Sequence, residues 1–221
     1  MGLDDWGLLF LASSALPTGS FAWSQGLESA AGLSVVTGPE DLAQYLKEAL
    51  LGSLARFDLP LLYRCFEAAR GQDESALISY GSWVLAGRET QELFQAEMEM
   101  GRALGRLIQS LGAPGFWSGT DLGYVATFAL LASLTAPNLT LERLGLIYAH
   151  AFLENQLAAA SRVTRLGQTA GRLIILSLGE TVARAVKEAR DIPNEEIGSR
   201  LWGLALLSSW HETMGSRLFR S

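Results

Sequence analysis

The residues that most often carry chemistry are scarce in this chain of 221 residues. It has one cysteine, Cys65, and two histidines, His150 and His211. A single cysteine excludes an intramolecular disulfide framework and fits a reducing compartment. No two of these side chains stand at the spacing of a helical metal-ligand pair. We therefore expect no bound metal and no cofactor, and only weak nickel binding by the isolated protein.

Charge is also scarce, and basic charge most of all. Charged residues make up 18% of the chain, and 23 acidic against 17 basic residues give a net charge of −6. A general nucleic-acid binder needs a basic face, so this balance argues against nucleic acid as a partner. Apolar residues reach 49%, which is typical of a chain with a well-filled core.

Long uninterrupted apolar runs are missing as well. Residues 6–27 and 122–141 carry no charge, but proline, glycine and several hydroxyl residues break them. Neither run offers the ~20 mostly apolar residues that a spanning helix needs. The first five residues hold two acids where a signal peptide would be basic. We expect a soluble, cytoplasmic protein with no membrane contact.

Catalytic motifs are absent too. There is no Gly-x-Ser-x-Gly elbow, no phosphate-binding Gly-x-x-x-x-Gly-Lys-Ser/Thr and no strand-coupled Gly-x-Gly-x-x-Gly. Cys65 stands among Leu61, Leu62 and Phe66, which predicts a buried thiol rather than a nucleophile. His150, between two alanines, is interpreted as a packed helix residue. These absences predict a protein that is not an enzyme.

What the sequence does contain is helical pattern. Between Arg88 and Leu111, apolar residues recur mostly every three to four positions, as on one face of an amphipathic helix. Leucine and alanine outnumber valine and isoleucine, which favours helix over strand. We predict one compact all-α domain over residues 1–221. Its roughly ten helices are expected near 4–13, 21–32, 39–56, 58–70, 73–86, 88–111, 120–135, 140–166, 168–190 and 195–212.

Helix starts support several of these boundaries. Pro39 and two following acids suit the first turn of a helix. Thr140 is a plausible N-cap, and Asn194, after a proline and before two glutamates, predicts another start.

A first polar stretch spans residues 16–28. Pro17 and Gly19 predict a turn, and Ser20 could cap a helix whose apolar face includes Trp23. An ordinary corner between two helices is the simpler interpretation.

A second polar stretch spans residues 161–172. Arg162 and Arg165 lie three positions apart and share a helix face. Buried, they would need carboxylate partners; exposed, they could receive an acidic partner. The sequence leaves both alternatives open.

The last residues, Arg217-Leu-Phe-Arg-Ser221, place an apolar pair between cations where chain ends are usually polar and disposable. This pair must be buried either by the protein's own core or by a partner.

Three stretches resemble the UreF family of urease accessory proteins. They are residues 14–28 (SALPTGSFAWSQGLE), 165–171 (RLGQTAG) and 211–221 (HETMGSRLFRS), with a weaker match at 88–92 and 100–101. Together they span nearly the whole chain in the family's order.

The resemblance implies an all-helical, cytoplasmic homodimer without a catalytic site. Such a protein binds UreD (UreH in some organisms) and recruits the GTPase UreG, and the assembly delivers nickel to apo-urease. Carried over by position, the UreD side comprises His211, Glu212, Arg217, Leu218, Phe219, Arg220 and Ser221. The dimer or UreG side comprises Pro17, Gly19, Ser20, Phe21, Trp23, Ser24, Gly26 and Glu28. Arg162, Arg165 and Gln168 are expected at an interface or as buried polar groups.

The chain departs from the family pattern at Gly215, Arg172 and Phe21, which puts individual polar contacts in doubt. Two other functions remain as alternatives. A direct GTPase-activating protein would use Arg217 or Arg220 to stabilise phosphoryl-transfer charge on UreG. A small-molecule-binding helical bundle would need a closed apolar pocket.

Overall fold

The computed structural model describes residues 3–164 and 166–220 and confirms the predicted all-α fold of about ten helices, with no strand among those residues. The α-helices are α1 (Leu3–Leu11), α2 (Leu27–Gly32), α3 (Pro39–Glu48), α4 (Leu59–Arg70), α5 (Glu74–Ala86), α6 (Gln91–Ser110), α7 (Tyr124–Thr135), α8 (Leu141–Val163), α9 (Gln168–Ser177), α10 (Gly179–Arg190) and α11 (Trp202–His211). Two 3-10 turns, η1 (Ser20–Ala22) and η3 (Asn194–Glu196), and a π-helix, η2 (Ala49–Asp58), complete the set.

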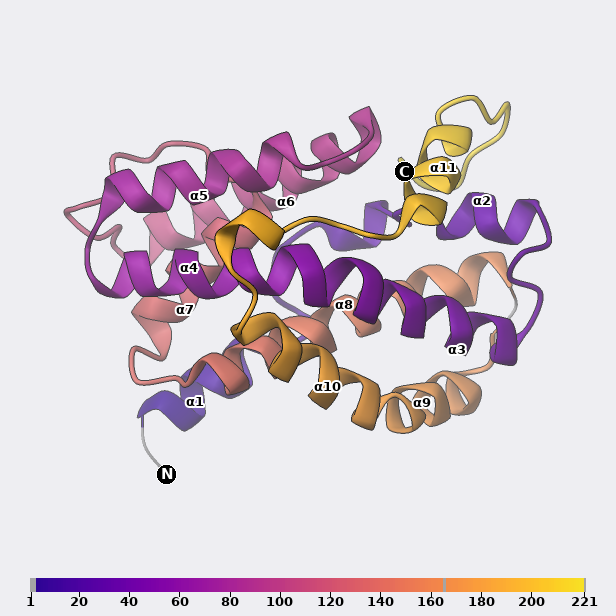
Figure 1. Cartoon of the computed structure of the whole chain (residues 1–221), viewed down its shortest axis with the longest axis horizontal. Coiled ribbons are helices and arrows are strands. Elements are labelled where there is room, and N and C mark those ends of the chain that lie inside the picture. The colour runs from indigo at the N-terminus through magenta and orange to yellow at the C-terminus, as the bar shows by residue number, and fades with distance from the viewer. Residues whose placement is uncertain (1–2, 165, 221) are drawn as a thin grey trace.

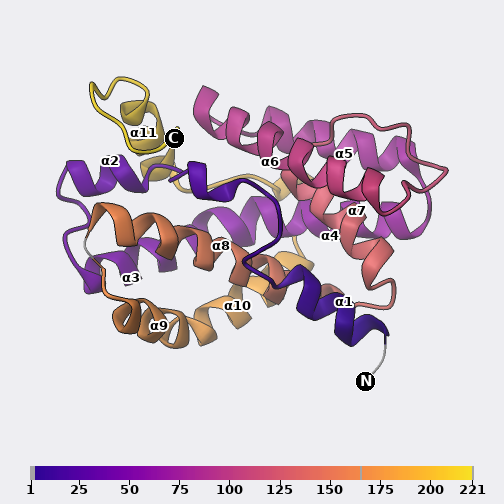
Figure 2. The same ribbon diagram turned by 180° about the vertical axis from the view of Figure 1, so that it is seen from behind.

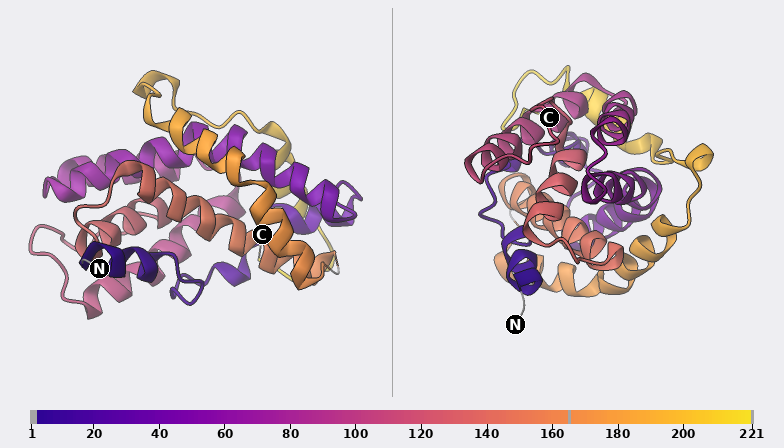
Figure 3. Two further views of the ribbon diagram at one scale, coloured as in Figure 1. Left: turned by 90° about the horizontal axis from the view of Figure 1, so that it is seen from below. Right: turned by 90° about the vertical axis from the view of Figure 1, so that its left-hand side faces the viewer.

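One long helix passes through the middle of the molecule (Figure 1). It comprises α3, η2 and α4, which follow one another from Pro39 to Arg70 without a break. The predicted break between residues 56 and 58 is wrong, because Asp58 and Leu59 keep helical backbone angles. The other helices pack around this axis: α4 contacts α5, α7, α8 and α10 (Figure 3).

Residues 197–201 cross the π-helix and form hydrogen bonds to its carbonyl groups. Pro60 has no N–H for the carbonyl of Arg56, and that carbonyl instead accepts a hydrogen bond from the Gly198 amide at 3.1 Å. The carbonyl of Gly52 accepts from the Arg200 amide at 2.9 Å. Residues 197–201 therefore run as an extended strap over η2.

This strap overturns one predicted helix. The helix expected at 195–212 forms only the turn η3 at Asn194 and then α11, which starts at Trp202. The acids after Asn194 are good starting residues, but the amides of Gly198 and Arg200 bond to η2 rather than along a helix.

Other boundaries move for local reasons. The helix expected at 21–32 is broken by positive φ at Gln25 (52°) and Gly26 (87°). The helix expected at 168–190 divides at Leu178, and that expected at 120–135 starts after Gly123, where φ is 78°. The Thr140 cap is confirmed, since its hydroxyl accepts from the Arg143 amide at 3.3 Å.

The core is built mainly from leucine and alanine with a few aromatic rings. Phe66 and Phe128 are fully buried, and Phe128 meets Tyr124 and Tyr148 with ring centroids 5.8 and 5.4 Å away. Gly101 of α6 lies against the backbone of Gly123, where an added Cβ would come within 2.4 Å of the Gly123 carbonyl carbon. A side chain there would force α6 and α7 apart.

None of the helices within residues 3–164 and 166–220 combines the length and apolar character that crossing a membrane requires.

Candidate protein-binding site

The segment between α1 and α2, residues 12–26, runs along the molecule from α1 to the region of α11. It leaves α1, crosses α8 through η1, and reaches α2 beside the C-terminal end (Figure 2). The left-handed backbone at Gln25 and Gly26 turns the chain into α2, and Gly26 lies against Leu204 and Leu207 of α11. This turn puts Glu28 into the first turn of α2, facing α11.

Four ionisable side chains meet there, which we call the Glu28 cluster: Glu28, Glu92, His211 and Arg217. The ring of His211 is fully buried between two carboxylates. Its Nε2 lies 2.9 Å from Glu28 Oε2, and its Nδ1 lies 2.8 Å from Glu92 Oε2. With both carboxylates ionised, both ring nitrogens must donate, so the geometry fits a protonated imidazolium.

The segment after α11, residues 212–220, closes this cluster. The amides of Leu218 and Phe219 donate to Glu28 Oε1 and Oε2 at 2.7 and 3.0 Å. Arg217 Nη1 donates to Glu92 Oε1 at 2.9 Å. Two carboxylates thus face an imidazolium and a guanidinium, so the cluster is charge-balanced when His211 is protonated.

The Glu28 carboxyl is tuned by these contacts. Burial by itself raises its pKa, but the Leu218 amide, the His211 ring and the Phe219 amide outweigh burial, so the pKa lies below its ordinary value. The carboxylate form of Glu28 is therefore the form that the C-terminal segment stabilises.

The apolar pair of this segment is split between core and solvent. Phe219 is only 5% exposed, whereas Leu218 is 71% exposed. The guanidinium of Arg162 lies 5.6 Å from the Phe219 ring centroid, and that of Arg220 lies 5.9 Å from the Trp23 ring. The protein's own core accounts for Phe219, and Leu218 remains available to a partner.

A second buried group, the Arg88 cluster, consists of Asp58, Arg88 and Glu97. Arg88 Nη2 lies 2.6 Å from Asp58 Oδ1 and 2.7 Å from Glu97 Oε2, and Glu97 Oε1 also accepts from the Val125 amide at 2.8 Å. Burial alone would lower the pKa of Arg88, but the two carboxylates raise it above its ordinary value. Burial raises the pKa of Tyr148 well above its ordinary value.

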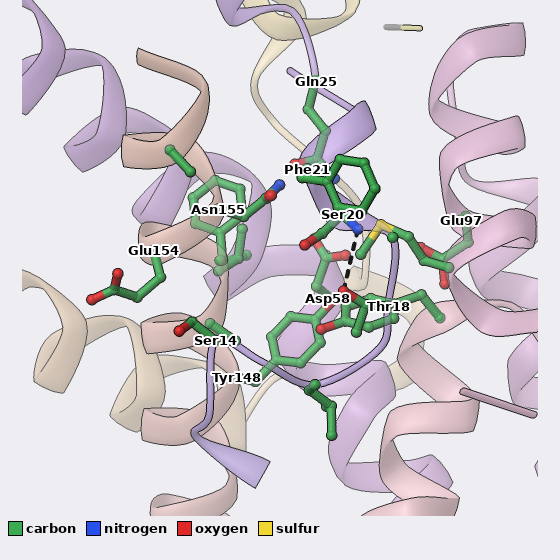
Figure 4. Close-up of a pocket in the computed structure, with 18 of the residues that line it drawn as sticks. Ser14, Thr18, Ser20, Phe21, Gln25, Asp58, Glu97, Tyr148, Glu154 and Asn155 are labelled. Atoms are coloured by element: carbon green, nitrogen blue, oxygen red, sulfur yellow. Dashed lines mark hydrogen bonds between the residues drawn. The ribbon is translucent and has the colours of Figure 1, made fainter. Parts of the chain in front are cut away.

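The Arg88 cluster lies at the wall of a cavity of about 530 Å³. Residues 11–21 cover one side of it, and Figure 4 shows Thr18, Ser20 and Phe21 of this segment near Asp58, Glu97 and Tyr148. The Ser20 amide donates to Thr18 Oγ1 at 3.2 Å. The cavity wall therefore combines apolar side chains, among them Leu93, Met100 and Phe152, with the charged groups of the Arg88 cluster, so it differs from the purely apolar pocket expected of a small-molecule-binding bundle.

The two sets of residues expected at different partners lie against each other. The resemblance places Glu28 and Trp23 on the dimer or UreG side, and His211 and Arg220 on the UreD side. In the structure, His211 contacts Glu28 and Arg220 contacts Trp23. Trp23, Ser24 and Glu28 are buried, Pro17 and Phe21 are exposed, and Gly19, Ser20 and Gly26 line the turns around them. Glu212 is exposed, and its side chain accepts from the Glu92 amide at 3.3 Å. Ser221 lies outside the described residues.

Within the second polar stretch, the structure describes Arg162 and Gln168. Arg162 is exposed, and its Nη1 donates to the carbonyl of Phe21 at 3.2 Å. Gln168 is exposed at the start of α9. Arg165 lies outside the described residues. For Arg162, the exposed alternative holds.

Several residues of these clusters were not among the candidates from sequence. Asp58 and Glu97 look like ordinary helix-face charges, whereas Arg88 and Glu92 lie in the weaker family match at 88–92 but were not named as site residues. Cys65 is confirmed as buried, and burial raises the pKa of its thiol. His150 is not packed as predicted, since 42% of its side chain is exposed. Its Nε2 lies 3.8 Å from Glu154 Oε1.

In the part of the chain that the structure describes, no group of three or more His, Cys, Asp or Glu is arranged to hold a metal ion. The charged groups of the Glu28 and Arg88 clusters instead pair with one another and with backbone amides. Such pairing holds the side chains of both clusters in fixed positions.

Comparison with known proteins gives the family. The family model for UreF matches residues 36–179. The urease accessory protein UreF of Chromohalobacter salexigens is 41% identical over 217 residues, covering 97% of this chain and 94% of that protein. The UreF proteins of Pseudoalteromonas translucida and Nostoc are 40% and 32% identical, and each alignment covers 97% of this chain. The chain belongs to the UreF family of urease accessory proteins, which supports a role in urease maturation.

Proposed function

We propose that this chain is a non-catalytic, cytoplasmic scaffold of urease maturation that acts as one domain over residues 1–221. It binds UreD (UreH) and recruits the GTPase UreG, so that nickel reaches apo-urease as the cargo of the whole assembly. The family supports the role in maturation, and the resemblance of the separate stretches supports the named partners.

The observation that carries the UreD contact is the exposed Leu218. It projects from a segment whose backbone is fixed on both sides: its own amide binds Glu28, and the Arg220 amide donates to the carbonyl of Ala22 at 2.9 Å. Leu218 is 71% exposed on an ordered backbone. Such a side chain is a good contact for a partner, because little conformational entropy is lost when it binds.

Capture of UreD from the same genome tests this contact. We expect Leu218→Asp to abolish co-purification with UreD while leaving the fold intact, since this side chain is exposed. Leu111→Asp is the matched control, because Leu111 is 54% exposed at the end of α6. Unchanged capture by Leu218→Asp would exclude Leu218 as a UreD contact. The substitution is sharper than deleting residues 217–221, which would also remove the buried Phe219.

Homodimerisation and the UreG contact are proposed for the exposed members of the first polar stretch, Pro17 and Phe21. Phe21 is 66% exposed and next to the cavity. Light scattering of Phe21→Ser protein, alone and with UreG, tests both contacts. A Phe21→Ser variant that remains dimeric and still binds UreG would exclude Phe21 as a contact in either interface.

The arginine-finger alternative has less support. Arg217 is bound to Glu92, and Arg220 stacks on Trp23, so either would have to leave its partner to reach a GTPase. Measuring GTP turnover by UreG with Arg217→Ala and Arg220→Ala protein separates the two functions. A decrease of only a fewfold, in proportion to lost binding, argues for the scaffold.

A further inference from the structure

The chain between α10 and α11 is tied to the central helix at two places. Arg64 of α4 donates from Nη2 to the carbonyl of Ile192 at 2.7 Å and from Nε to Asn194 Oδ1 at 2.5 Å. Further along, the Arg200 amide donates to the carbonyl of Gly52 at 2.9 Å. The turn η3 and most of the strap therefore lie between two anchors on the same long helix.

Arg56 of η2, which lies between these anchors, has donors without a partner. Its carbonyl accepts from the Gly198 amide, but in the part of the chain that the structure describes its side-chain Nε and Nη2 are buried and have no hydrogen-bond partner. These two nitrogens form one edge of the guanidinium, which can bind a carboxylate through two parallel N–H···O bonds. Buried donors without a partner are rare, because they have lost their hydrogen bonds to water. An acceptor is therefore expected at this edge.

Glu196 holds a carboxylate beside the same guanidinium. Its Oε2 lies 3.6 Å from Arg56 Nη2, farther than the about 2.7–2.9 Å of a charge-assisted hydrogen bond. The Glu196 side chain is 57% exposed and that of Arg56 only 17%, so the carboxylate can move toward the guanidinium without displacing packed groups. Glu196 ends η3, two positions before Gly198. A closed pair would thus lie next to the backbone bond that already joins the strap to Arg56.

We propose that Arg56 and Glu196 form a latch: the Glu196 carboxylate closes on Nε and Nη2 of Arg56 and holds the strap on η2. In the closed latch, Arg56 holds the strap through its carbonyl and its side chain together. If the strap leaves, the carbonyls of Gly52 and Arg56 lose the strap's donors, so the latch also stabilises the π-helix. The inference concerns this chain alone and does not depend on the proposed partners.

Substitutions at the two positions separate charge, reach and pairing geometry. Glu196→Gln removes the negative charge, whereas Glu196→Asp keeps it on a side chain that is one methylene shorter. Arg56→Lys keeps the positive charge but loses the two-donor edge. Glu195→Gln is the matched control, because Glu195 is an exposed acid of the same turn.

The Nε–H signal of Arg56 in nitrogen–proton correlation spectra tests the latch at the atom itself, and its loss in Arg56→Lys protein assigns it. A carboxylate bound at this edge protects the proton, and hydrogen bonds to charged groups are the stronger ones. We therefore expect the signal to shift in Glu196→Gln and its exchange with solvent to become at least about tenfold faster. The same shift and exchange rate in wild type and Glu196→Gln would overturn the proposal.

Hydrogen exchange of the Gly198 and Arg200 amides gives the second readout, because both donate to carbonyls of η2. We expect this exchange to be faster in Glu196→Gln, less so in Glu196→Asp, and unchanged in Glu195→Gln. In Arg56→Lys protein, adding Glu196→Gln should change the rate little further, since the pair is already broken. Equal acceleration by Glu195→Gln, or fully additive effects of Arg56→Lys and Glu196→Gln, would show that the two side chains do not act as a pair and would overturn the latch.

Discussion

The two buried ion clusters of this protein are built from similar groups but hold different things together. The Arg88 cluster joins η2, the start of α6 and the start of α7 in the middle of the fold, with two carboxylates around one cation. The Glu28 cluster joins α2, α6 and α11 to the segment that follows α11: Glu28 meets the His211 ring and two backbone amides, and Glu92 meets His211 and Arg217. The first stabilises the bundle, whereas the second stabilises the course of a peripheral segment.

Removing the cation of the Arg88 cluster should have the largest effect. In Arg88→Met, two carboxylates whose side chains are only 6% and 5% exposed lose their shared partner. Breaking a buried pair in this way costs about 3–5 kcal/mol of unfolding free energy. Urea denaturation measures the loss, with exposed Arg106→Met as control. A loss below 1 kcal/mol would show that water reaches these carboxylates.

The apolar part of the C-terminal segment should rank second. Phe219→Ala removes a ring that is 5% exposed, and core Phe→Ala changes typically cost about 3–5 kcal/mol. At this peripheral site, which can relax, we expect the lower end of that range. Leu218→Ala, one residue away, should stay within about 0.5 kcal/mol. Equal effects at the two positions would contradict the division between core and solvent.

The Glu28 cluster should also respond to acid. The folded-state pKa of Glu28 lies below its ordinary value of 4.5, so its contribution to stability is complete above that pH and is lost as pH falls through the lower folded value. The stability difference between wild type and Glu28→Gln should therefore shrink below about pH 4.5. Thermal unfolding of both proteins from pH 7 to pH 3 measures it. A difference that stays constant over this range would assign the effect to shape and not to charge.

The smallest effect is expected at Arg162. Its guanidinium stacks on Phe219 from an exposed position, and exposed cation–π contacts contribute about 0.5–1 kcal/mol. Arg162→Lys should keep most of this contribution and Arg162→Ala should lose it. Chemical denaturation of both variants measures which is less stable. An Arg162→Ala protein as stable as wild type would show that the contact with Phe219 does not stabilise the fold.

Sequence pattern predicted the fold better than it predicted the site. The apolar spacing from Leu93 to Leu111 and the Thr140 cap are local signals, and both correspond to helices of the structure. The π-helix is missed because the Gly198 and Arg200 amides that bond to its carbonyls come from far away in sequence. The continuity through Pro60 depends on Gly198, which lies far away in sequence.

The Glu28 cluster shows the same limit for the site. His211 and Glu28 were both candidates, but for different partners, because nothing local indicates that positions 183 residues apart are hydrogen-bonded. Glu92 was not a candidate at all. Its single buried carboxylate is indistinguishable in sequence from the solvated acids around it.

The order of synthesis gives the Glu28 cluster one more consequence. Glu28 leaves the ribosome long before His211 and Phe219 are made, so during translation its carboxylate has only water as a partner. The helices of the bundle can pack in that time, but α2 and the turn before it cannot reach their final arrangement until the chain has been made through residue 219. A prematurely terminated product would therefore contain most of the bundle, but Glu28 in α2 and Glu92 in α6 would lack the partners that the last residues supply.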